Sequence, residues 1–278
     1  MQIKFLGTRG SIPAPGMDTV KYGGNTSCVE VTSDEGIRII IDAGTGIRKI
    51  NKNFKLDSEN IVKLFFTHSH WDHLQGLPFF NQLFVPDRKI NFFINKIYFE
   101  EIKDAIIKQM SGKTFPVQFD SLPSVIKFIE VDKKYVFNAN FTLELCENYH
   151  PGGSTGLKFT DGNKIFVFIT DNEIKLLKER GLYPNLVEFC KNADIIAHDG
   201  QYLDADMRIK KGWGHSTIED LVKLFIDCNV KIGIFTHHDP ERKDDEVDEM
   251  EQWANDEIKK QNSTIKIIAA KEDLIIEV

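Results

Sequence analysis

The feature that most constrains the fold is a predicted strand that runs directly into a cluster of metal-binding side chains. Apart from Lys63, residues 62–67 are β-branched, aromatic or apolar, and His68, His70, Asp72 and His73 follow within six residues. Zinc favours imidazole nitrogen and carboxylate oxygen, so His68 and His70 can face one ion while Asp72 and His73 face a neighbouring one. The alternative is a solvated turn, or a helix start capped by Asp72 with the histidines in water.

The remaining metal-ligand candidates also lie where predicted strands end. The chain has eight histidines, and none belongs to a regular helical pattern. His150 and His237 each follow a predicted strand, as does Asp171. A carboxylate at a buried strand end can reach two cations at once, which makes Asp171 a candidate bridge. On its own, Asp171 is better explained as the cap of a helix beginning near Asn172, and only the other candidate ligands favour the bridging role.

Alternating strands and helices without a linker or repeat predict one α/β domain over residues 1–278. No glycine-rich phosphate turn follows the first strand, which argues against a simple doubly wound sheet and favours two sheets faced by helices. Predicted strands cover residues 3–6, 29–32, 37–42, 62–67, 141–146, 164–170, 195–198 and 232–236, and predicted helices cover 100–110, 217–226 and 244–256.

Composition narrows the range of partners and compartments. The net charge of −7 and the pI near 5.7 argue against a large nucleic-acid partner and favour a small substrate. Four widely spaced cysteines form no CxxC pair and are typical of reduced, packed thiols. With no leader pattern and no long apolar stretch, we expect a cytoplasmic protein without a membrane span.

The chain resembles the metallo-β-lactamase superfamily. The run from His68 to His73 matches its HxHxDH signature, and the segments 5–8 (Phe-Leu-Gly-Thr) and 42–46 (Asp-Ala-Gly-Thr-Gly) are similar to opening motifs of the ribonuclease Z and phosphoribosyl cyclic phosphodiesterase branch. The resemblance spans nearly the whole chain. It implies a four-layer αββα sandwich.

The resemblance also implies a complete set of ligands for two metal ions per chain. One ion would be held by His68, His70 and His150, the other by Asp72, His73 and His237, with Asp171 bridging both. Two Zn²⁺ are expected, with Mn²⁺ or Fe²⁺ as alternatives. His70 replaces the glutamate of flavodiiron proteins, and the cysteine of true β-lactamases is absent, so oxygen reduction and β-lactam cleavage are not expected.

Further residues have predicted roles around these ligands. His215 begins a His-Ser-Thr motif similar to that of ribonuclease Z, so we expect it and Asp72 to take part in catalysis. The alternative for His215 is a residue that only precedes a capped helix. Asp42 and His198 are expected to orient ligands, although His198 could also be a core histidine, and His238 is expected to face substrate or water.

The predicted function is a phosphodiesterase that cleaves small cyclic phosphodiesters or cyclic nucleotides with a metal-bridging hydroxide. The short gap between His150 and Asp171 leaves no room for the RNA-binding arm of ribonuclease Z. The alternatives are a lactone or thioester hydrolase, and a non-catalytic, metal-stabilised nucleotide-binding protein. Residues 79–130 are interpreted as a variable lid or homodimer face, with ordinary core packing as the alternative for most of their aromatic side chains.

Overall fold

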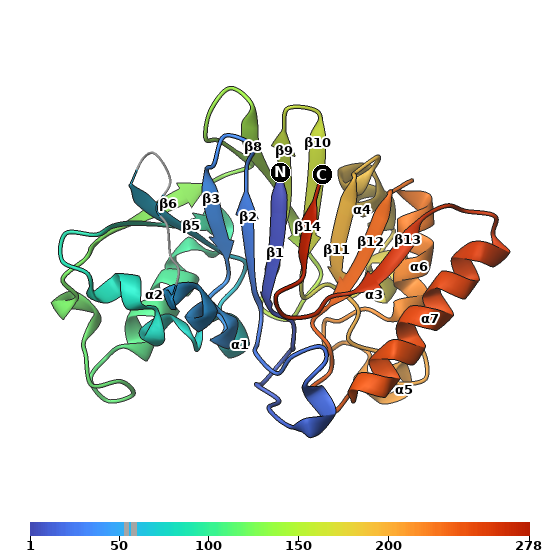
Figure 1. Ribbon diagram of the computed structural model, residues 1–278, viewed down its shortest axis with the longest axis horizontal. Coiled ribbons are helices and arrows are strands. Elements are labelled where there is room, and N and C mark those ends of the chain that lie inside the picture. Colours follow the sequence, from blue (N-terminus) through green and yellow to red (C-terminus); the bar gives the residue numbers. More distant parts are fainter. Residues whose placement is uncertain (53–55, 57–59) are drawn as a thin grey trace.

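The protein is a sandwich of two mixed β-sheets with helices on both outer faces (Figure 1). A computed structural model describes residues 1–52, 56 and 60–278. In order across the first sheet lie β14 (Ile275–Glu277), β1 (Gln2–Gly7), β2 (Cys28–Thr32), β3 (Arg38–Ile41), β4 (Ile61–Phe66), β5 (Lys89–Asn95) and β6 (Val125–Val131). In order across the second lie β13 (Lys266–Ala269), β12 (Ile232–Thr236), β11 (Ile195–Asp199), β10 (Lys164–Ile169), β9 (Ser154–Asp161), β8 (Phe141–Asn148) and β7 (Lys134–Val136).

The helices form the two outer layers and several of the connections. The α-helices are α1 (Trp71–Leu74), α2 (Phe99–Gln109), α3 (Ile174–Glu179), α4 (Tyr183–Cys190), α5 (Met207–Lys210), α6 (Ile218–Asp227) and α7 (Asp244–Lys260). Short 3₁₀ helices span Met17–Thr19, Thr45–Lys52, Leu77–Phe79, Asn81–Phe84, Lys96–Tyr98 and Phe119–Ser121. In Figure 1, α1 and α2 flank the first sheet, whereas α6 and α7 flank the second.

Alternate residues of each central strand face different hydrophobic layers. In β4, Phe65 packs between the two sheets, while Phe66 packs toward the helices of the first half of the chain. In β10, Phe166 packs between the sheets and Val167 toward the helices of the second half. Because successive side chains of a strand point to opposite faces, each of these apolar strands contributes to two hydrophobic cores. The four-layer αββα class is confirmed.

All eight predicted strands and all three predicted helices are present, but the described residues form six further strands that were not predicted. The segment 79–130 contributes β5, α2 and β6, so it is a structural part of the first sheet. Phe80, Phe92 and Phe93 are fully buried, which favours core packing for them, whereas Phe79 is 60% exposed. The predicted lid or homodimer face stays a prediction.

Parallel pairing brings several strand ends to one edge of the sandwich. Strands β3, β4 and β5 are parallel neighbours in the first sheet, and β10, β11 and β12 in the second. The carboxyl ends of parallel strands meet at the same edge, where loops can bring polar side chains together. The candidate site lies at this edge.

Candidate metal centre

The predicted ligands follow strands from both sheets. His68 follows β4, and Asp171 and His237 follow β10 and β12. Asp171 and His237 have left-handed backbone conformations, with φ of 54° and 60°, and Asp42 after β3 has φ of 60°. Left-handed non-glycine residues cost free energy and persist where the surrounding structure holds them, often at functional sites. Three of the predicted site residues therefore adopt a backbone conformation that turns the chain sharply at the strand end.

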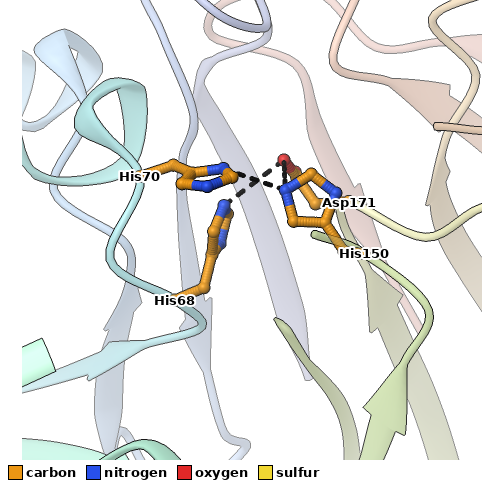
Figure 2. Close-up of side chains that lie close together, drawn as sticks. All are labelled: His68, His70, His150 and Asp171. Atoms are coloured by element: carbon orange, nitrogen blue, oxygen red, sulfur yellow. Dashed lines mark hydrogen bonds and ion pairs between the residues drawn. The ribbon is translucent and has the colours of Figure 1, made fainter. Parts of the chain in front are cut away.

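The first cluster consists of His68, His70, His150 and Asp171 (Figure 2). One potential ligand atom from each residue lies within 4.8 Å of the others. His150 Nε2 is 2.9 Å from His70 Nδ1, and Asp171 Oδ2 is 3.4 Å from His68 Nε2 and 3.5 Å from His150 Nε2. Figure 2 shows the three rings converging on the carboxylate.

The second cluster consists of Asp72, His73 and His237. His237 Nε2 lies 3.1 Å from Asp72 Oδ2 and 3.2 Å from His73 Nε2. The other carboxylate oxygen of Asp171 faces this cluster, because its Oδ1 lies 3.3 Å from both His73 Nε2 and His237 Nε2. The two oxygens of Asp171 thus face different clusters, which is the geometry that a bridging carboxylate requires.

The spacing of these atoms matches the coordination shell of a small cation. Zinc bonds to imidazole and carboxylate of about 2.0–2.1 Å imply neighbouring ligand atoms roughly 3.3 Å apart in a tetrahedral site. The distances of 2.9–3.5 Å within the two clusters lie around that value. The donor set of imidazoles and carboxylates is also the one that zinc prefers.

The outer nitrogens of the histidines are held by protein acceptors. His73 Nδ1 lies 2.7 Å from Asp42 Oδ2, His150 Nδ1 is 3.0 Å from the Gly214 carbonyl, and His237 Nδ1 is 3.0 Å from Gln201 Oε1. When Nδ1 donates its proton outward, Nε2 is left with a lone pair that points into the cluster. Such outward bonds orient histidine ligands in metal sites.

His68 provides a direct test of whether the cluster suits a cation. Its Nε2 is buried and has no hydrogen-bond partner, although buried polar atoms are normally paired. Burial and the neighbouring charge of His73 lower the pKa of His68 to about 3, which keeps the ring neutral. A neutral imidazole with an unpaired inward nitrogen is the form that binds a metal. The residues present therefore fit the metal that their pattern implies.

Asp171 is electrostatically suited to remain charged. Burial raises the pKa of Asp171, but the interactions of its carboxylate with His237 and His73 outweigh burial and hold that pKa well below its usual range. Asp171 does not cap α3, because that helix begins at Ile174 and has Glu173 in the N-cap position without a side-chain cap. The helix-cap alternative for Asp72 is also excluded, because His70 occupies the N-cap position of α1.

His215 lies beside both clusters. Its Nδ1 is 3.0 Å from Asp199 Oδ2, and its ring lies 5.2 Å from His150 and 5.1 Å from His237, centroid to centroid. Thr217 caps α6 as the alternative predicted, but the His215 ring is held independently by Asp199. Burial lowers the pKa of His215, whereas its hydrogen bond with Asp199 raises it, and the net pKa is above the usual value. A shift toward the protonated form suits hydrogen-bond donation to an anion.

Two histidines that were predicted to lie near the ligands contact no ligand directly. His198 reaches the site through a neighbour of Asp171, and His238 lies in the core. His198 Nδ1 donates to the Asp199 carbonyl, and its Nε2 accepts from Asn172 Nδ2 at 3.0 Å, so it contacts the neighbour of Asp171 and no ligand directly. The prediction that His238 faces substrate or water is wrong. His238 is 1% exposed and its Nε2 donates to the Ala270 carbonyl at 2.7 Å, because the ring turns into the core.

Sequence reasoning missed three residues that hold the site together. Asp199 positions His215, Gln201 contacts His237, and Glu173 accepts backbone N–H groups from the loop before His215. Asp199 carried a usable signal, since it ends an apolar strand as Asp171 does. The sequence around Gln201 and Glu173 gives no such signal, because their partners are 36 and 41 residues away in the chain.

Comparison with known proteins supports the class defined by the fold and the site. Ribonuclease Z of Picrophilus torridus is 27% identical over 289 residues, covering 88% of this chain and 87% of its own. The metallo-β-lactamase fold protein YhfI of Bacillus subtilis superposes with a TM-score of 0.68 at 16% identity, covering 100% of this chain and 98% of its own. Zn²⁺-bound PqqB of Methylobacterium extorquens gives a TM-score of 0.69 at 14% identity, with both chains covered completely.

The protein is a metal-dependent hydrolase of the metallo-β-lactamase superfamily, in the branch that includes ribonuclease Z. Within this class, the family model of the Anti-Pycsar protein Apyc1 matches residues 1–259. The chain belongs to that family.

Two further predictions concern the chain as a whole. All four cysteines are unpaired, and Cys28, Cys190 and Cys228 are buried, so the prediction of packed thiols is confirmed for these three while Cys146 is partly exposed. Among the helices in the described part of the chain, none combines the length and the apolar character needed to cross a bilayer.

Proposed function

We propose that this hydrolase is a dinuclear phosphodiesterase that cleaves small cyclic phosphodiesters, with cyclic nucleotides as the leading substrate class. The observation that carries the proposal is the position of Asp171, whose two oxygens face two separate His/Asp clusters. Two cations held this way can contact both the attacking and the leaving oxygen of a phosphodiester. The likeness to ribonuclease Z supports phosphodiester chemistry.

The chain's own residues supply the two ligand sets. We assign His68, His70 and His150 to one ion, and Asp72, His73 and His237 to the other, with Asp171 shared. We propose Zn²⁺ for both, on the basis of the donor set and its spacing. Bound metal ions of this kind supply Lewis acidity, which activates water near neutral pH and polarises a phosphoryl oxygen.

His215 is proposed to stabilise the negative charge that develops on the phosphoryl group. The bond from His215 Nδ1 to Asp199 leaves Nε2 as the ring atom available to a substrate oxygen. The raised pKa of His215 favours the protonated form of that ring. Asp199 also accepts the Ser216 N–H at 2.8 Å, so one carboxylate holds both the His215 ring and the backbone of the next residue. A preorganised donor of this kind costs no reorganisation during the reaction.

Two observations support a small substrate over a folded RNA. Between His150 and Asp171 the chain forms the hairpin of β9 and β10, whose strands pair from Lys164 with Asp161 to Phe168 with Leu157, and no arm is inserted there. The net charge of −7 disfavours a long polyanion.

The unpaired cysteines fit a reducing compartment, so we also propose a cytoplasmic location.

The test is hydrolysis by protein stripped of metal and reloaded with Zn²⁺, Mn²⁺ or Fe²⁺. The substrates are 3′,5′- and 2′,3′-cyclic nucleotides, a phosphoribosyl cyclic phosphate, bis(p-nitrophenyl) phosphate and a lactone. We expect metal-dependent cleavage of the cyclic phosphodiesters and no activity in Asp171→Asn. Lactone opening without any phosphodiester cleavage would contradict the proposal, and so would nucleotide binding without turnover.

A further inference from the structure

We infer that Trp213 provides the stacking surface for an aromatic base on the substrate, and that Glu173 holds Trp213 in place for this purpose. The inference rests on the proposed function and narrows its substrate class to phosphodiesters that carry a base. It follows from the loop between α5 and α6, in which Trp213 is flanked by Gly212 and Gly214.

The backbone on both sides of Trp213 is fixed by one buried carboxylate. Gly212 N–H donates to both oxygens of Glu173, at 3.0 and 2.9 Å, and Gly214 N–H donates to Oε2 at 3.0 Å. Glu173 is fully buried, and hydrogen bonds to a buried charged acceptor are among the stronger ones. Gly212 and Gly214 have φ of 88° and 90°, a conformation that side chains disfavour. Trp213 is therefore presented by a rigid arch, which we define as residues 212–214.

The arch is in direct contact with the first cluster. The Gly214 carbonyl accepts the bond from His150 Nδ1, and a Cβ on Gly214 would lie 2.1 Å from that nitrogen. The next residue, His215, is the proposed charge-stabilising donor. Because Trp213 precedes Gly214 directly, its backbone lies at the border of the centre where the phosphodiester would react.

The indole of Trp213 is 55% exposed although its backbone is held firmly. A large exposed aromatic side chain on a rigid backbone beside a reaction centre is suited to bind a planar ligand group. In a cyclic nucleotide the base is attached to the same sugar as the phosphodiester, so a base would lie next to the phosphate site. Stacking on an aromatic side chain does not depend on base identity, since every base has a π-face.

The chain contains a matched control for this residue. Trp253 is 39% exposed and lies on α7, where it borders two surface cavities that are lined mostly by residues of α6 and α7 and by no predicted ligand. The third tryptophan, Trp71, is 68% exposed at the first position of α1, where none of the described carboxylates accepts the backbone N–H groups on both sides of it. These three are all the tryptophans of the chain.

The first experiment compares Trp213→Ala, Trp213→Phe and Trp253→Ala on two substrates. One is a 3′,5′-cyclic nucleotide, and the other is the matching methyl riboside cyclic phosphate, in which a methoxy group replaces the base. For Trp213→Ala we expect kcat/KM on the nucleotide to fall roughly 5- to 150-fold through KM, the effect of losing one stacking partner. On the methyl riboside we expect no change. Trp213→Phe should recover most of the nucleotide activity, and Trp253→Ala should match the wild type.

An equal effect of Trp213→Ala on both substrates would overturn the inference while leaving the proposed function intact. Absence of cleavage of either substrate by the wild type would instead contradict the proposed function. A second measurement uses Trp71→Phe/Trp253→Phe protein, whose only tryptophan is Trp213. We expect a nucleoside monophosphate to quench its fluorescence at concentrations where ribose 5-phosphate does not, and quenching by neither would overturn the inference. The same protein with Glu173→Gln should show weaker quenching, and unchanged quenching would overturn the assigned role of Glu173.

Discussion

Asp42→Asn is the substitution that most sharply tests how the metal centre is oriented. Asp42 is fully buried, and its Oδ1 accepts the Thr67 N–H at 2.8 Å while Oδ2 lies 2.7 Å from His73 Nδ1. Asparagine has nearly the same shape and adopts the left-handed conformation readily, so the backbone need not move. The amide oxygen must still face the Thr67 N–H, which places the NH₂ group against His73 Nδ1. The imidazole proton is then forced onto Nε2, the nitrogen that faces the second cluster.

The size of this effect follows from the bond that is lost. A hydrogen bond to a charged group contributes about 1.5–3 kcal/mol, which corresponds to roughly 10- to 150-fold in an equilibrium constant. Loss of an outer hydrogen-bond partner typically lowers metal affinity about 10- to 100-fold. We therefore expect Asp42→Asn to fold normally and to bind one of the two proposed metal ions about 10- to 100-fold more weakly.

Competition with a chromogenic zinc chelator measures this affinity, and circular dichroism checks the fold. The matched control is Asp194→Asn, because Asp194 Oδ2 also accepts a strand N–H, that of Ile165 at 2.8 Å, without contacting any predicted ligand. Wild-type zinc affinity in Asp42→Asn would refute the orienting role of Asp42. So would an equal loss of affinity in Asp194→Asn.

Four further substitutions test other parts of the site. Asp171→Ala should abolish hydrolysis and reduce the metal retained after dialysis, as measured by elemental analysis, because both clusters lose an oxygen ligand. His215→Ala should retain its metal and lower kcat about 10²- to 10³-fold, the usual cost of one charge-stabilising donor, and unchanged kcat would contradict its role. Gly214→Ala should lower kcat by about 10²-fold or more, because the new Cβ would collide with His150, and metal content per chain measured alongside should fall as well. His238→Ala should lower the free energy of unfolding by about 1–3 kcal/mol in urea titrations while metal content stays unchanged, because the Ala270 carbonyl loses its buried donor.

The centre of the site was predictable because its residues follow a local rule. His68, His70, Asp72 and His73 lie within six residues, and their spacing places them in one turn after a strand. Dispersed ligands such as Asp171 also carry a local signal, since each ends an apolar strand. Parallel pairing then brings these strand ends together. Local sequence and topology therefore agree on the composition of the clusters.

The residues that orient the ligands were less predictable because their contacts depend on tertiary packing. Nothing near Glu173 indicates that it accepts two N–H groups from residues 39 and 41 positions away. For His238 the sequence suggested a role at the site that the structure does not give it. It adjoins His237, but the left-handed turn at His237 sends the next side chain into the core. A shift of one residue at a strand end reverses the direction in which a side chain points, and the sequence alone does not determine at which residue the strand turns.

The missed strands have a related explanation. β5 reads Lys-Ile-Asn-Phe-Phe-Ile-Asn and its last four residues are all buried, so the polar alternation of a half-exposed strand stops after Asn91. β9 begins after two glycines and contains Gly156, which lowers its β-propensity. Their position is determined by pairing with β4 and β10, which only the folded chain reveals.

The measurement that tests the central claim most directly is the metal content of the purified protein, by elemental analysis, alongside hydrolysis of a cyclic nucleotide. The account predicts about two metal ions per chain, loss of activity on chelation, and recovery on addition of Zn²⁺. The Asp171→Asn protein, measured in parallel, should retain less metal and no activity. A wild-type protein that binds no metal under any loading condition would contradict the account.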